Sequence, residues 1–230
     1  MSPGPAVAEA VVFVHGIWRR ARSLNRLARA LQRAGYLVLN ESYHSVTHDI
    51  PEAAAIIWRR IESLQAPRVH FVTHSMGGLI VRHLLGAHPV PSLGHVVMIA
   101  PPSRGAALAD HYSHFPFFRW LLGRSGLQLR SGDLGLGASL PPPPCPFAIF
   151  AGRRGTPRGW HPLIPGDDDG TVGVREAWLP GAAAFITVLA GHSFIMNHPE
   201  VIRGTVEFLQ SGQITMCGSG GEAVVTPACR

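Results

Sequence analysis

Short apolar runs alternate with helical segments along most of this chain. The expected strands are residues 11–14, 36–39, 69–72, 96–99, 147–150 and 184–189, and the expected helices are residues 23–34, 49–64, 76–85 and 199–209. Strands that are apolar throughout, and that are separated by helices, are typical of a parallel sheet with both faces buried. We therefore expect an α/β fold with three layers, in which helices cover both faces of a mostly parallel central sheet.

The alternation stops between the fourth and fifth expected strands. Residues 102–144 hold many aromatic and aliphatic side chains, then a Gly-rich segment, then four consecutive prolines. We interpret this stretch as a small cap inserted between two strands of a single domain that spans residues 1–210. Residues 211–230 contain Gly and Ser and are expected to form a flexible tail.

The charge of the chain comes from arginine alone. The 20 basic residues include no Lys, and the formal net charge is +6. This composition indicates a GC-rich coding sequence more than a polyanion-binding surface, and no nucleic-acid recognition motif accompanies it. Arg22, Arg26, Arg29 and Arg33 are expected on the solvated face of the first helix, opposite Leu24, Leu27, Ala28 and Leu31.

Cysteine usage and hydropathy indicate a cytoplasmic protein. The three cysteines, Cys145, Cys217 and Cys229, are widely spaced and odd in number, which predicts reduced thiols and no zinc site. No run of about 18 apolar residues predicts a transmembrane helix, and the N-terminus does not resemble a signal peptide. We expect no membrane span, although transient contact with a membrane surface is compatible with the sequence.

Ser75 lies between an expected strand and an expected helix, in the segment THSMGG. A sharp strand-to-helix turn lifts a serine Oγ clear of the sheet, and it requires small residues two positions before and after the serine. Gly77 meets this requirement, whereas Thr73 stands where glycine is commonest. We predict that Ser75 is a nucleophile in spite of this departure.

The first strand runs into the segment HGIW. In a fold with a nucleophile elbow, this loop lies beside the nucleophile, so it can supply one of the two backbone N–H groups that bind an oxyanion. We predict that the N–H groups of Ile17 and Met76 form this oxyanion hole. Trp18, with Phe117, Phe118 and Trp120 from the cap, is predicted to bind substrate.

The segment after the fifth strand contains three consecutive aspartates, Asp167, Asp168 and Asp169. A carboxylate in this place can orient a catalytic histidine, and the order Ser, Asp, His is that of a hydrolase elbow. We predict Asp169 as this acid, with Asp168 in reserve. The spacing excludes a calcium loop of the EF-hand kind.

His192 follows the sixth strand and is predicted to be the catalytic base. His198 is its competitor, but the His198–Pro199 pair is typical of the start of a helix. The other histidines lack the carboxylate or cysteine partners of a metal set, so we expect neither a metal nor a cofactor.

The motifs HGIW, THSMGG, DGTV and GHS, in this order, resemble those of the α/β-hydrolase superfamily. The resemblance covers residues 11–209, and it is closest to small lipase-like members with a minimal cap and to the lipase-like domains of glycosylphosphatidylinositol deacylases. It implies hydrolysis of small-molecule or lipid carboxylic esters through an acyl-enzyme, without a cofactor. An acyltransferase or thioesterase with the same triad, and a non-catalytic binding module on the same fold, are the alternatives.

Overall fold

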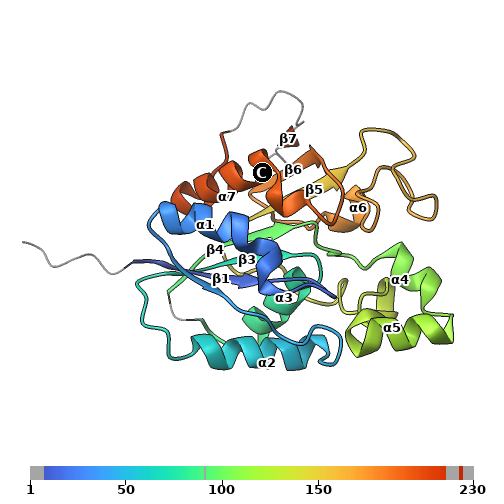
Figure 1. Cartoon of the computed structure of the whole chain (residues 1–230), viewed down its shortest axis with the longest axis horizontal. Helices are drawn as coiled ribbons and strands as arrows, with labels where there is room; N and C mark the ends of the chain where they lie inside the picture. Colours follow the sequence, from blue (N-terminus) through green and yellow to red (C-terminus); the bar gives the residue numbers. More distant parts are fainter. Residues whose placement is uncertain (1–7, 91, 216–222, 225–230) are drawn as a thin grey trace, which may run out of the picture.

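The structure is a computed structural model that describes residues 8–90, 92–215 and 223–224. Within these residues, a seven-stranded sheet forms the middle layer of the molecule (Figure 1). Its strands are β1 (Ala10–Val14), β2 (Leu37–Asn40), β3 (Val69–His74), β4 (Leu93–Ile99), β5 (Phe147–Arg153), β6 (Ala184–Leu189) and β7 (Ala223–Val224). They lie in the order β2-β1-β3-β4-β5-β6-β7. The first six are parallel, and β7 pairs antiparallel with β6.

The strand order places a crevice at the carboxyl ends of two central strands, β1 and β3. The chain runs from β1 outward to β2 and then returns to β3 on the other side of β1. At such a reversal the connections after the two central strands diverge, which leaves space beyond their carboxyl ends. The loops after β1 and β3 therefore meet at this crevice.

Helices cover both faces of the sheet, as Figure 1 shows. On one face lie α1 (Asn25–Arg33), preceded by the 3-10 turn η1 (Ala21–Leu24), and α7 (Pro199–Ser211). On the other lie α2 (Ile50–Ile61) and α3 (Gly77–Ala87), which pack against each other. Each face has its own apolar core: Leu27 and Phe208 belong to the first, and Ile57 and Leu84 to the second.

The cap lies beyond the carboxyl ends of the strands, at the right of Figure 1. It contains α4 (Ala107–Tyr112), α5 (Pro116–Leu127) and the 3-10 turn η2 (Gly132–Leu134). Gly123 interrupts α5 with a φ of +62°, and a Cβ at this position would lie 2.2 Å from the carbonyl oxygen of Val46. Glycine is thus required where the cap helix meets the loop between β2 and α2.

The predicted fold class is confirmed, and the predicted elements agree closely with the observed ones. Asp49 and Glu52 form a capping box at the start of α2, where the helix over residues 49–64 was expected to begin. The expected apolar face of the first helix is buried, and Arg22, Arg26, Arg29 and Arg33 are exposed. The cap helices, β7 and the short helix α6 (Val174–Ala177) were not predicted.

Three further expectations concern the ends of the chain and the membrane. Most of the expected tail, including Cys217 and Cys229, lies outside the described residues, whereas Cys145 has a free thiol. In the part of the chain that the structure describes, none of the helices combines the length and apolar composition needed to cross a bilayer.

Candidate active site

Ser75 occupies a strained turn between β3 and α3. Its φ is +55°, in the left-handed region that residues with a Cβ adopt at a cost of about 1–2 kcal/mol. The turn is held on both sides, because the Ser75 N–H donates to the carbonyl of Ile99 at 2.8 Å and the Gly78 N–H donates to the carbonyl of Ser75 at 2.9 Å. The surrounding hydrogen bonds therefore maintain the strain and direct the serine toward the crevice.

Two glycines allow the chain to pass close to this turn. A Cβ on Gly77 would lie 2.2 Å from the carbonyl oxygen of Val14, and a Cβ on Gly16 would lie 2.8 Å from the Cβ of Ser75. Thr73, where glycine is commonest, is fully buried, and its Oγ1 donates to the carbonyl of Val97 at 3.4 Å. The threonine side chain is accommodated here with its hydroxyl satisfied.

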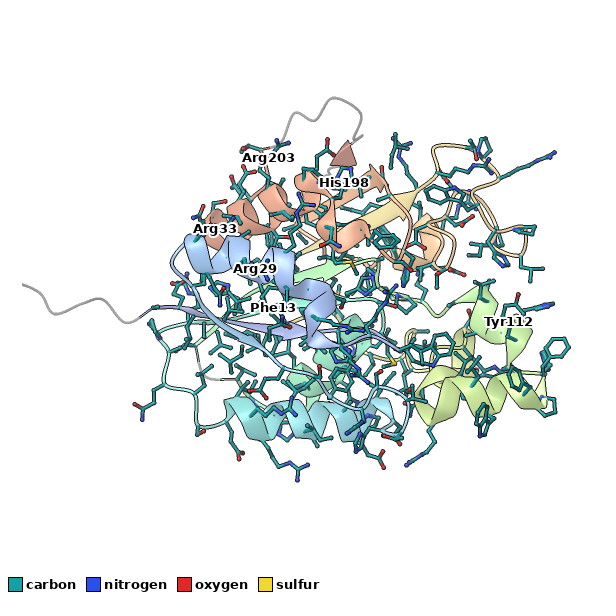
Figure 2. The ribbon with its side chains drawn as sticks, in the orientation of Figure 1. Phe13, Arg29, Arg33, Tyr112, His198 and Arg203 are labelled. Atoms are coloured by element: carbon teal, nitrogen blue, oxygen red, sulfur yellow. The ribbon has the colours of Figure 1, made fainter. Side chains whose placement is uncertain are left out.

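Ser75, His192 and Asp169 form a hydrogen-bonded chain. The His192 Nε2 lies 3.0 Å from Ser75 Oγ, and the His192 Nδ1 lies 2.7 Å from Asp169 Oδ2. Since a carboxylate only accepts, Nδ1 carries the ring proton and Nε2 is free to accept the serine proton. His198, the competitor, instead begins α7, where its Nδ1 accepts the Glu200 N–H at 3.3 Å (Figure 2).

The three consecutive aspartates have different surroundings. Asp169 is 4% exposed, and its Oδ1 accepts the N–H groups of Thr171 and Val172 at 2.9 and 2.7 Å, which leaves Oδ2 for His192. Asp168 is fully buried and accepts the N–H groups of His161 and Gly170. Asp167 accepts those of Arg154 and Gly155. Only Asp169 therefore contacts His192, and the other two hold the loop that carries it.

Gly152 makes room for the acid, and the sequence analysis did not single it out. A Cβ at this position of β5 would lie 2.7 Å from the Cβ of Asp169 and 2.5 Å from the carbonyl oxygen of Ala190. Glycine inside a strand often marks such a close approach, so the signal was present in the sequence.

The segments that carry the N–H groups of Ile17 and Met76 meet at the nucleophile. Met76 follows Ser75 directly, and Ile17 follows Gly16, which touches Ser75. Among the described residues, neither N–H donates to another protein group. Tyr43 holds the loop that carries Ile17. Its hydroxyl donates to the carbonyl of His15, and its ring stacks on the imidazole of His15 with centroids 4.2 Å apart.

A cavity of about 370 Å³ opens beside Ser75 and His192. Its walls are largely apolar and come from the cap, the acid loop and the loop after β1. The cap contributes Leu108, Ala109, Tyr112, Leu122 and Leu129, and the loop after β1 contributes Ile17, Trp18 and Arg19. Figure 2 shows Tyr112 on α4, in the cap. A space of this kind suits an apolar group bound next to the serine.

The residues predicted to bind substrate differ in their position relative to the cavity. Trp18 lines the cavity, but Phe117 and Trp120 do not, since they lie on α5 with 68% and 76% of their surface exposed. The side chain of Phe118 lies outside the described residues. The helix instead turns Leu122 inward, because only one side of α5 faces the cavity.

The cap is fastened to the rest of the domain by polar contacts. The Trp18 Nε1–H donates to the carbonyl of Leu121 at 3.1 Å, the Ser125 hydroxyl to the carbonyl of Ser45 at 2.8 Å, and the Ile50 N–H to the Gln128 side chain at 2.7 Å. Glu176 accepts the N–H of Ala107 at 2.7 Å, and burial raises the pKa of its carboxyl. These contacts hold the cap in place over the cavity.

The strand order, the parallel direction of the first six strands and the two helical layers define an α/β-hydrolase fold. Residues 2–121 match the family model described as Domain of unknown function (DUF7379), and the chain belongs to this family. No curated protein sequence matches it.

Solved structures of similar fold include lipases and esterases. The mature lipase BlEst2 of Bacillus licheniformis superposes with a TM-score of 0.62 at 19% identity, covering 92% of this chain and 94% of that chain. The lin2722 product of Listeria innocua gives 0.61 at 15% identity, covering 92% and 96%. A metagenomic carboxyl esterase gives 0.58 at 18% identity, covering 91% and 77%. The predicted α/β-hydrolase fold is thereby confirmed.

Proposed function

We propose that this chain hydrolyses carboxylic esters with apolar acyl groups through an acyl-enzyme on Ser75. The observation that carries the proposal is the hydrogen-bonded chain Ser75–His192–Asp169 at the base of a largely apolar cavity. The esterase and lipase neighbours support it as an analogy of fold.

In the first half-reaction, His192 Nε2 takes the Ser75 proton while Oγ attacks the ester carbonyl carbon. The developing oxyanion is bound by the N–H groups of Ile17 and Met76. Asp169 holds the protonated ring in place and stabilises its charge. His192 then gives the proton to the leaving alkoxide, and an alcohol departs.

In the second half-reaction, His192 takes a proton from water, and the resulting hydroxide attacks the acyl carbon. Collapse of the tetrahedral intermediate breaks the bond to Ser75 Oγ, which recovers its proton from His192. The products are a carboxylic acid and the free enzyme. No metal or organic cofactor enters the proposed steps.

Covalent labelling with a fluorophosphonate probe tests the nucleophile, and p-nitrophenyl esters test turnover. The wild-type chain should be labelled at Ser75 and should release p-nitrophenol, and Ser75→Ala should lose both properties. Ser193→Ala is a matched control, because Ser193 also lines the cavity but stands outside the hydrogen-bonded chain. Equal labelling of Ser75→Ala and wild type would contradict the proposal.

A further inference from the structure

The outer surface of the cap exposes large aromatic side chains. Phe115, Phe117 and Trp120 are 52%, 68% and 76% exposed, and the rings of Phe117 and Trp120 lie 5.9 Å apart. Isolated exposed apolar residues are ordinary on protein surfaces, but a group of aromatic rings on one element indicates a contact surface. We name Trp18, Phe115, Phe117 and Trp120 the aromatic rim.

The aromatic rim is continuous with the mouth of the cavity. Trp18 is 51% exposed, lines the cavity beside Ser75, and donates its indole N–H to the carbonyl of Leu121 on α5. One residue thus belongs both to the outer surface and to the entrance of the site. A molecule that covers the aromatic rim would also cover this entrance.

The charges beside the aromatic rim are positive. Arg19, Arg20 and Arg22 follow Trp18 directly; Arg19 lines the cavity, and Arg20 and Arg22 are exposed. None of these three forms an ion pair with another described residue. Over residues 107–127 the chain has one carboxylate, Asp110, which lies 3.8 Å from the Arg130 guanidinium. The neighbourhood therefore attracts anions.

We propose that the aromatic rim and Arg19, Arg20 and Arg22 together dock the protein on an anionic phospholipid bilayer. Trp and Phe rings insert at the boundary between headgroups and acyl chains, and arginines beside them bind the headgroup phosphates. The cavity entrance then faces the lipid. The inference rests on the proposed function only in naming esters held in that lipid as substrates, since docking itself needs no turnover.

Sedimentation with sucrose-loaded vesicles measures docking directly. The full chain should pellet with vesicles of phosphatidylcholine and phosphatidylglycerol, far less with phosphatidylcholine alone, and less as the salt concentration rises. Ser75→Ala should pellet like wild type. Docking without ester hydrolysis would therefore refute the proposed function and leave the docking surface standing.

Two sets of variants, one apolar and one basic, test which side chains form the docking surface. Trp120→Ser and Phe117→Ser should each lower the partition coefficient about tenfold, because each removes one inserted ring. Leu37→Ser, which removes an exposed apolar side chain at the start of β2, should leave it unchanged. The double variant Arg20→Gln/Arg22→Gln should lower it about tenfold or more. The double variant Arg29→Gln/Arg33→Gln removes the same charge from the far part of α1 (Figure 2) and should have little effect.

Four outcomes would overturn the docking proposal. Three are an absence of sedimentation with anionic vesicles, equal binding by Trp120→Ser and Leu37→Ser, and equal losses in the two arginine double variants. The fourth comes from size-exclusion chromatography without lipid. A dimer that Trp120→Ser converts to a monomer would show that a second copy of the chain covers the aromatic rim.

Discussion

The imidazole Nε2–H of His74 donates a hydrogen bond to the backbone carbonyl of His192, at 3.0 Å. The residue before the proposed nucleophile thus holds the backbone of the proposed base. Burial keeps the pKa of His74 well below its usual value, with a further contribution from the nearby His192, so the ring is neutral. Its Nδ1 is buried without a partner among the described residues.

His74→Leu should lower kcat about three- to tenfold with little change in KM, because one hydrogen bond that positions His192 is lost. His74→Gln, which keeps an N–H donor, should recover part of the loss. Steady-state kinetics with a p-nitrophenyl ester, beside a thermal melt, separates positioning from stability. His44→Leu, at an exposed site, is the control. A change confined to the melting temperature would assign His74 a purely structural role.

Asp169→Asn and Asp168→Asn should differ in kind. Asp169→Asn should reduce kcat by about 10³–10⁴-fold, since the amide no longer selects the tautomer of His192. Asp168→Asn should keep most activity but destabilise the fold by about 1–3 kcal/mol, because the carboxylate that holds two backbone N–H groups is altered. Turnover and urea unfolding of both variants test this. Reversed effects would move the acid to Asp168.

Arg82→Met should loosen the cap. Arg82 is 2% exposed, and its guanidinium donates to the carbonyls of Ser103 and Pro141 at 3.0 Å each, and to that of Leu140. One side chain of α3, the helix that follows Ser75, therefore binds both ends of the cap. Burial lowers its pKa to about 10, which leaves it charged at neutral pH.

The loss of these contacts should reduce the free energy of unfolding by about 2–4 kcal/mol. Arg82→Lys should recover part of it, and Arg26→Met, on an exposed helix face, should cost little. Urea denaturation provides the measurement. If Arg82→Met lowers the free energy of unfolding no more than Arg26→Met does, the cap does not depend on this contact.

Stability should fall as the pH drops below about 6.5, the ordinary pKa of histidine. His15, His70 and His74 are buried, and burial lowers the pKa of each ring. Between the lowered folded pKa and the unfolded one, the unfolded chain binds more protons, so the free energy of unfolding decreases with falling pH by about 1.4 kcal/mol per pH unit for each such group.

Urea unfolding between pH 7.5 and 5.5 measures this slope. His70→Gln should reduce the slope by about 1.4 kcal/mol per pH unit, which corresponds to one proton, whatever the substitution does to stability at pH 7.5. His114→Gln, at an exposed site, should leave the slope unchanged. A slope that is flat over this range in the wild type would be inconsistent with neutral buried histidines.

The preference for acyl length should depend on the inner face of the cap. With soluble p-nitrophenyl esters, kcat/KM should rise from acetyl toward octanoyl, because each methylene buried in the cavity contributes about 0.8 kcal/mol, or roughly fourfold. Ala109→Phe should fill the cavity and depress octanoyl turnover more than acetyl turnover. Trp120→Ala should leave the profile unchanged, since this side chain points away from the cavity. A flat profile in wild type would exclude the cavity as an acyl pocket.

Local patterns in the sequence were sufficient to predict the three layers of the fold and the position of the turn at Ser75. Apolar runs and helical periodicity report which faces are buried, and these depend on near neighbours in the chain. The expected strand 184–189 matches β6, and the helix expected from residue 49 begins at the Asp49 capping box. Each of these features requires only a few consecutive residues.

Tertiary structure decided which of several equivalent side chains meets which partner. Three adjacent aspartates have the same chemistry, and the backbone N–H groups of the folded loop determine that Asp169 reaches His192. The aromatic residues of α5 were expected to bind substrate, but Phe117 and Trp120 lie outside the cavity. That helix is held by contacts distant in sequence, such as Gly123 against Val46 and Trp18 with Leu121. Contacts over such sequence separations depend on the packing of whole elements, which a local pattern does not encode.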